Sequence, residues 1–121
     1  MHALRNSLTR WVTMALAAAC ASLLWPVQAR ADNVAYLVNV TVRPGYNFPN
    51  AASALDYGHG ICDKIAAGRT YAQIMGDVKA DFATSDEFQA SYLITQAANE
   101  LCPEQIWQLR NSAAGYRPPA P

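Results

Sequence analysis

The sequence predicts an all-α fold: a small bundle of three to five helices, stapled by one disulfide bond and preceded by an N-terminal signal peptide. Three observations support this prediction. Apolar residues recur at helical spacing along residues 51–102. Residues that commonly begin and end helices separate the apolar stretches. An even pair of cysteines, Cys62 and Cys102, remains once the predicted signal peptide is removed.

The first 31 residues have the three parts of a secretory signal. Met1 to Arg10 is basic, Trp11 to Trp25 is almost continuously apolar, and Ala29-Arg30-Ala31 fits the small-x-small cleavage pattern. We therefore expect cleavage after Ala31 and a secreted, extracytoplasmic protein. Because the apolar run is shorter than the about 20 residues that span a bilayer, no stable membrane span is expected after cleavage. An uncleaved anchor and lipid attachment at Cys20 are the alternatives.

Cleavage would leave one small domain. We expect a helical domain at residues 32–112 and a Pro-rich disordered tail at residues 113–121. The remaining chain has six basic and nine acidic residues, because three arginines leave with the signal. This mildly acidic balance argues against a nucleic-acid partner, since phosphate binding needs clustered Lys and Arg.

Cys62 and Cys102 are the only cysteines after residue 31. In an exported protein, two cysteines and no spare one indicate a disulfide bond. Closing a loop of about 40 residues would stabilise the fold by about 4 kcal/mol in the chain-entropy description. Two free, buried thiols are the alternative.

Residues 33–43 fit two descriptions. Apolar residues alternate with others from Val34 to Val42, which is the period of a strand. No second strand-like run follows, and a single buried strand would leave its backbone N–H and C=O groups unpaired. A short helix that buries Tyr36, Leu37 and Val40 avoids this problem, so we favour a helix and keep the strand as the alternative.

Two prolines, a glycine and two asparagines predict a loop from Arg43 to Asn50. We expect Tyr46 and Phe48 to fold from this loop onto the core. The next helix is predicted from Ala51 to Ala67, with Asn50 or Ser53 as its N-cap.

Glycines mark two features of that predicted helix. Gly68 is placed for the left-handed residue that follows a helix. Gly58 shares a face with Cys62, and its missing side chain would allow another helix to approach closely.

Two further helices each begin with the pattern of a capping box. Thr70 to Gln73 opens one, and Thr84 to Glu87 opens the other. Pro103 ends the second helix just after Cys102, because a residue before proline avoids helical geometry. One more short turn is predicted at residues 104–111, with its apolar side chains docked on the domain, namely Ile106, Trp107 and Leu109.

The segments around the cysteines resemble a known family. The matching positions are Gly58-x-x-x-Cys62, Gly68, Ala97-Ala98 and Leu101-Cys102-Pro103. They resemble domain of unknown function family 732, small secreted proteins of actinobacteria, mostly mycobacteria, over residues 35–109. The resemblance implies an all-helical domain with Cys62 bridged to Cys102, and it implies no activity. The valine-rich residues 33–43 depart from the family pattern.

His59 is the single histidine after residue 31. Asp56 precedes it by three residues and Asp63 follows it by four, so on a helix the three side chains share one face. This arrangement fits a general base flanked by a carboxylate, or part of a weak metal site. Ordinary surface charges on a helix have the same spacing, and no nucleophile is placed beside the histidine. We therefore predict no catalytic residue, no metal site and no cofactor.

Aromatic residues are numerous for a domain of this size. They indicate either a core filled by rings or a groove for an apolar ligand or a protein partner. The candidate ligand-binding residues are Tyr46, Phe48, Tyr57, Tyr71 and Tyr92.

Together these features predict a secreted binding or interaction protein of unknown ligand, acting at the cell envelope or outside the cell. Its partner would be a protein or a small apolar ligand. One alternative is a small secreted enzyme that uses His59 with Asp56 or Asp63. The other is a structural or inhibitory protein that presents the loop Arg43–Asn50 to its target.

Overall fold

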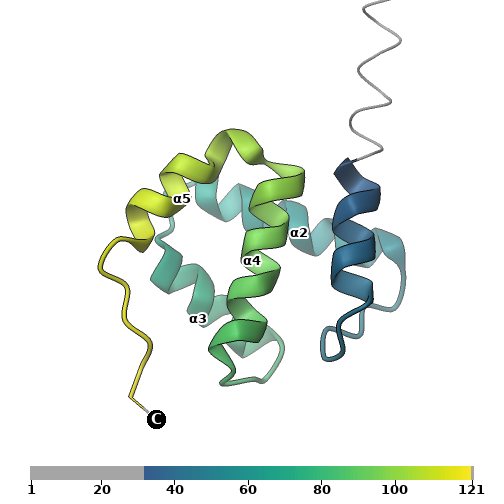
Figure 1. Ribbon diagram of the computed structural model, residues 1–121, viewed down its shortest axis with the longest axis horizontal. Helices are drawn as coiled ribbons and strands as arrows, with labels where there is room; N and C mark the ends of the chain where they lie inside the picture. Colours follow the sequence, from purple (N-terminus) through teal and green to yellow (C-terminus); the bar gives the residue numbers. More distant parts are fainter. Residues whose placement is uncertain (1–31, 121) are drawn as a thin grey trace, which may run out of the picture. The chain divides into compact units, whose positions relative to one another are not determined.

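A computed structural model describes residues 32–120 of the chain, and within them the fold is all-α (Figure 1). The helices are residues 32–41, α2 (Ala51–Ala66), α3 (Tyr71–Asp81), α4 (Glu87–Leu101) and α5 (Ile106–Ala113), with a short 3-10 helix, η1 (Pro103–Gln105), before the last. The predicted bundle of three to five α-helices is confirmed for this part of the chain. The predicted signal peptide and its cleavage site lie outside the described residues.

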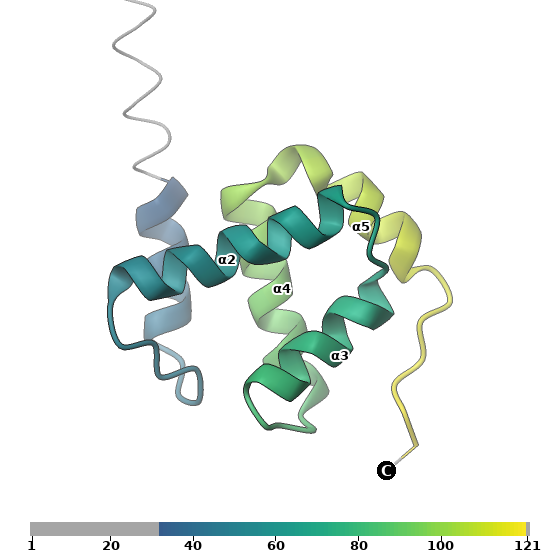
Figure 2. The ribbon, with the colours of Figure 1, turned by 180° about the vertical axis from the view of Figure 1, so that it is seen from behind.

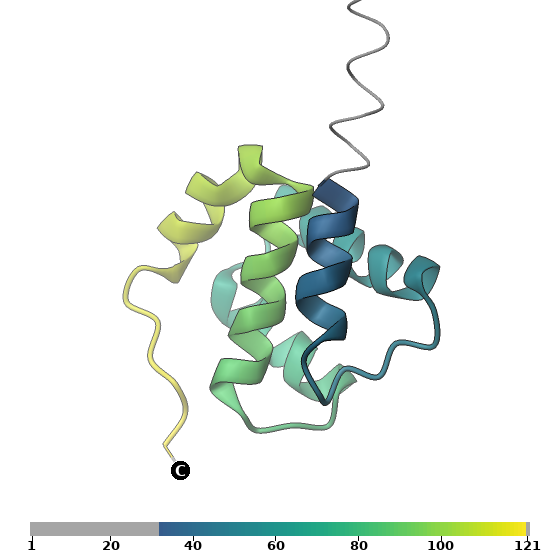
Figure 3. The ribbon, with the colours of Figure 1, turned by 45° about the vertical axis from the view of Figure 1, so that its right-hand side comes forward.

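Helix α4 is the element that most others pack against. It contacts both α2 and α3, and α2 crosses it on the side seen in Figure 2. The helix at residues 32–41 lies beside α4 (Figure 3), where the Asn39 side chain donates a hydrogen bond to Gln96 at 2.8 Å. Helix α5 packs on α3 and follows α4 through η1. None of the described helices has the length and hydropathy needed to cross a bilayer.

The predicted disulfide bond is present. It joins Cys62 in α2 to Cys102, the residue that follows α4, with their Cα atoms 6.0 Å apart. Both cysteines are buried. The bond therefore fixes the two longest helices to each other inside the core.

Residues 32–41 form a helix, as favoured over a strand. Tyr36 and Val40, which are four residues apart, are buried on its inner face. Val34 and Val38 lie on the opposite face, Val42 directly follows the helix, and all three are more than half exposed. The alternation of apolar residues therefore does not mark the two faces of a strand. Tyr36 and Val40 face the core, and the valines between and before them, Val38 and Val34, face solvent.

The start of α2 and of α3 follows the sequence closely. The Asn50 side chain caps α2 by accepting a hydrogen bond from the Ser53 N–H at 2.8 Å. Thr70 and Gln73 form the predicted capping box of α3, with both reciprocal hydrogen bonds present. Gly68 has a φ of +90° after α2, as expected for a left-handed residue.

The predicted capping box at Thr84 is wrong, because α4 begins two residues later with Asp86 as its N-cap. The Thr84 N–H is used at the end of α3, where it donates to the Lys79 carbonyl at 3.0 Å. The Asp86 carboxylate instead accepts from the N–H groups of Phe88 and Gln89. The Thr84 hydroxyl accepts from the N–H of Asp86 itself at 3.1 Å, so it caps no N–H group inside α4.

Of the two glycines in α2, Gly58 is the one that neighbouring side chains approach closely. A Cβ atom there would lie 2.6 Å from Leu101 Cδ1 and 2.7 Å from Tyr36 Cζ. The Tyr36 hydroxyl reaches across this glycine and donates a buried hydrogen bond to the Ala54 carbonyl at 2.9 Å. The close approach predicted at Gly58 is therefore present, and the first helix supplies the ring that needs it.

The C-terminal residues follow the prediction in part. Leu109 is buried and Ile106 is half-buried, but Trp107 is 72% exposed, so the expectation that Trp107 docks on the domain is wrong. In α5 the Leu109 face points to the core, and Trp107 is two residues away, on the other side of the helix. Beyond Ala113 the chain makes a turn at Ala114 and Gly115 and then has no regular secondary structure up to residue 120; the disorder predicted for this tail stays a prediction.

Candidate functional site

A pocket of about 350 Å³ lies between α3, α4, α5 and the first residues after α5. Buried Ala98 and Leu109 are part of its apolar floor. Side chains with hydrogen-bonding groups stand at its exposed rim. The complete lining is Tyr71, Thr95, Ala98, Asn99, Ile106, Leu109, Arg110, Ala113 and Tyr116.

Helix α5 forms one wall of this pocket and is tied to its neighbours by two side chains. The Gln108 amide donates to the Ile65 carbonyl in the last turn of α2 at 2.6 Å. The Ser112 hydroxyl accepts from the Tyr71 N–H at 3.0 Å and donates to the Leu109 carbonyl at 2.9 Å. The hydrogen bond from the Tyr71 N–H to Ser112 gives the first N–H of α3 a partner, and it holds the α3 and α5 walls of the pocket together.

Tyr116 closes the end of the pocket beside α3. Gly115 has a φ of +79°, which turns the chain after α5. The Tyr116 ring then packs edge to face on Tyr71, with centroids 4.9 Å apart. Its hydroxyl donates to a Glu87 carboxylate oxygen at 2.7 Å, and Glu87 also pairs with Lys79. Burial raises the pKa of both tyrosines above the usual value, so both phenols stay protonated at neutral pH.

Three of the predicted ligand-binding residues fill space in the domain. Tyr46, Phe48 and Tyr57 surround the Phe82 ring, each within 6 Å of its centroid. Tyr46 is 5% exposed and donates to the Gln89 carbonyl at 2.5 Å. Burial raises its pKa to about 12. These rings form a packed cluster, although Phe48 also borders a hollow of about 130 Å³.

The other two candidates lie apart from that cluster and from each other. Tyr92 donates to the Asn39 carbonyl and supports Arg43, whose guanidinium carbon lies 3.9 Å from the ring centroid. Exposed Phe88 flanks the same arginine at 4.7 Å. Tyr71 is the one predicted candidate that lines the 350 Å³ pocket.

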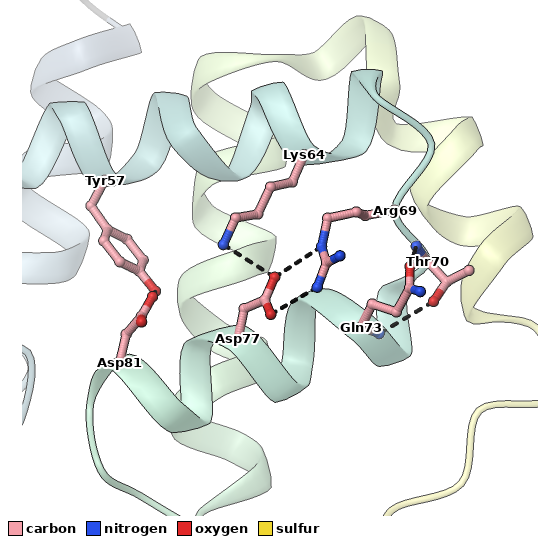
Figure 4. A network of polar contacts seen from close by, with 7 residues as sticks. All are labelled: Tyr57, Lys64, Arg69, Thr70, Gln73, Asp77 and Asp81. Atoms are coloured by element: carbon pink, nitrogen blue, oxygen red, sulfur yellow. Dashed lines mark hydrogen bonds and ion pairs between the residues drawn. The ribbon is translucent and has the colours of Figure 1, made fainter.

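A polar network joins α2 and α3 on another side of the domain (Figure 4). Asp77 of α3 receives two hydrogen bonds from Arg69, at 2.8 and 3.0 Å, and pairs with Lys64 at 3.1 Å. Tyr57 donates to Asp81 at 2.8 Å, one turn along. Partial burial tends to raise the pKa of Asp77, but the hydrogen bonds and charges of Lys64 and Arg69 outweigh it and lower the pKa below its usual value.

Replacing Asp77 by asparagine should lower the free energy of unfolding by about 1 kcal/mol at pH 7, since two partly exposed ion pairs are lost. Because the folded-state pKa of Asp77 is depressed, this contribution is complete above the unfolded value of about 4. It is lost as the pH falls through the folded-state pKa. Urea unfolding at a series of pH values from 7 down to 2 measures the difference between the two proteins. Asp63→Asn on the exposed side of α2 is the control, and an Asp77→Asn deficit that does not shrink anywhere in this series contradicts the argument.

His59, Asp56 and Asp63 are all exposed on α2. None of them lines the pocket between α3, α4 and α5. No group of three or more His, Cys, Asp or Glu side chains among residues 32–120 could hold a metal ion.

Sequence reasoning missed the residues that make the pocket polar: Thr95, Asn99, Arg110 and Tyr116. One signal was available for Tyr116, an aromatic residue in a tail otherwise rich in Pro, Gly and Ala. No signal marked the other three, because exposed polar residues on helices are common.

The sequence model of the family described as protein of unknown function DUF732 matches residues 29–104. The chain belongs to this family. The match spans the helix at residues 32–41, α2, α3, α4 and the disulfide, and it ends before α5. Within this DUF732 protein, α5 and Tyr116 of the pocket therefore lie outside the matched residues. No curated protein and no solved structure matches the chain.

Proposed function

We propose that this DUF732 protein is an exported binding protein that acts at the cell envelope or outside the cell. Its ligand would occupy the pocket between α3, α4 and α5. The observation that carries the proposal is the construction of this pocket, with a buried apolar floor at Ala98 and Leu109 below a polar rim. Binding sites for small molecules commonly combine an apolar lining with a few polar groups.

Export is supported by two features of the chain. The first 31 residues have the basic, apolar and small-residue parts of a secretory signal. The single disulfide bond is a second indication, because such bonds persist mainly in oxidising compartments.

The size of the pocket favours a small molecule. A volume of about 350 Å³ is near the lower end of the range of about 300–1,000 Å³ for ligand pockets. A larger hollow of about 470 Å³ lies beside Pro119 and Ala120, but none of the residues that line it is buried. Of these two, the smaller pocket is the one whose lining includes buried residues, Ala98 and Leu109, so it reaches into the core of the domain.

The proposal is tested with a neutral apolar probe, N-phenyl-1-naphthylamine, whose fluorescence rises in apolar surroundings. We expect saturable binding of one probe per protein. Ala113→Phe should abolish it, because residue 113 is half-buried and lines the pocket. Ala114→Phe is the matched control, since Ala114 is exposed and does not line the pocket.

Circular dichroism establishes that both variants keep their helices. Absence of saturable binding to the parent protein contradicts the proposal. Equal binding by the parent protein and Ala113→Phe contradicts the assignment of the ligand to this pocket.

A further inference from the structure

Arg110 is the one charged residue among those that line the pocket. It stands on α5, is exposed, and lines the same pocket as buried Leu109. Two further polar side chains of the lining, Thr95 and Asn99, are uncharged and lie one turn apart on α4. The lining therefore combines a single positive charge with neutral hydrogen-bonding groups.

The guanidinium of Arg110 is available for a ligand. The ion pairs found within residues 32–120 use Lys64, Arg69 and Lys79. The guanidinium carbon of Arg110 lies 5.8 Å from the centroid of the exposed Trp107 ring, a loose contact, and none of the ion pairs among the described residues uses this guanidinium. An arginine is a planar fork of N–H donors that matches the two oxygens of a carboxylate.

Resting on the proposed function above, we propose that the ligand is a monocarboxylate with a single apolar chain. Its chain would cover the floor at Ala98 and Leu109, and its carboxylate would accept hydrogen bonds from Arg110 at the rim. Asn99 and Thr95 supply further donors for the same oxygens. Each part of the ligand then has a counterpart in the lining.

Charge and volume argue against other anionic ligands. A polyanion needs several clustered cations, whereas this rim holds one, in a chain with nine acidic residues. A pocket of about 350 Å³ is small among ligand sites, which favours one chain over the two of a membrane lipid. A monocarboxylate has the single charge and single chain that the site can match.

The test compares decanoate with decan-1-ol, which share one chain and differ in the head group. Amide chemical shifts of the ¹⁵N-labelled protein report binding at Tyr71, Ala98 and Leu109. We expect decanoate to bind about tenfold more tightly, because a charge-assisted hydrogen bond replaces a neutral one. This preference should weaken as the salt concentration rises, while decan-1-ol binding stays constant.

Arg110→Gln should reduce the preference to about equal binding, and Arg110→Lys should retain part of it because the charge remains. Arg117→Gln is the matched control: it removes an exposed arginine that does not line the pocket, and the preference should stay. Equal affinity of the two ligands for the parent protein overturns the assignment of a carboxylate. In that case the binding of decan-1-ol still supports the proposed function. Failure of both ligands to shift these amides overturns both proposals.

Discussion

Replacing both cysteines with alanine, Cys62→Ala together with Cys102→Ala, should lower the free energy of unfolding by about 4 kcal/mol. The disulfide closes a loop between residues 40 positions apart, and without it the unfolded chain gains the freedom that the loop removes. Small domains are stable by only about 5–15 kcal/mol, so this bond supplies a large share of the total. We therefore expect the double variant to be partly unfolded at mild urea concentrations at which the parent protein is folded.

Urea unfolding followed by circular dichroism measures this difference. The parent protein should lose about the same stability when a reductant is added, whereas the double variant should be indifferent to reductant. A parent protein whose midpoint does not move with reductant contradicts the prediction. Alkylation of both thiols in the unreduced protein, seen as added mass, would exclude the bond itself.

Local sequence chemistry predicted most of the fold. Asn50, Thr70 and Gly68 act where the sequence placed them, because a cap depends only on residues within one turn. The choice of helix for residues 32–41 succeeded for a non-local reason: no other segment offered a strand partner. The helical period then selected Tyr36 and Val40 as the buried pair.

The wrong predictions concern the N-cap of α4 and the packing of Trp107, both of which depend on contacts with neighbouring helices. Thr84 has the side chain of an N-cap, but its hydroxyl accepts from the Asp86 N–H and its own N–H closes α3, so Asp86 caps α4 instead. Trp107 was expected to pack because it is large and apolar, yet α5 turns its Leu109 face inward. Helix spacing alone cannot assign the inner face of a short helix that has apolar residues on both sides.

The candidate site was harder to predict than the fold. Tyr46, Phe48 and Tyr57 cluster with Phe82, and Tyr92 supports Arg43, so four of the five candidate rings lie outside the pocket. The pocket instead forms where residues far apart in the sequence meet. Such a site depends on how the helices pack, and no local sequence pattern predicts it.

Gly58→Ala should destabilise the domain by about 2 kcal/mol, although alanine favours a helix by about 1 kcal/mol over glycine. The added Cβ would lie 2.6 Å from the Leu101 side chain and 2.7 Å from the Tyr36 ring. Tyr36 of the first helix is fully buried and held by its hydrogen bond to the Ala54 carbonyl of α2, so the ring has little room to move. The first helix would have to shift away from α2, which weakens the packing of Val40 as well.

Gly60→Ala is the matched control, because it lies two residues along the same helix and a Cβ there meets nothing within 4 Å. It should stabilise the domain by about 1 kcal/mol through helix propensity alone. The two variants share that propensity gain, so the expected gap of about 3 kcal/mol between them measures the close approach of Tyr36 and Leu101. Urea unfolding gives both values. Equal stability of Gly58→Ala and Gly60→Ala would mean that the first helix does not press on α2 as closely as the structure has it.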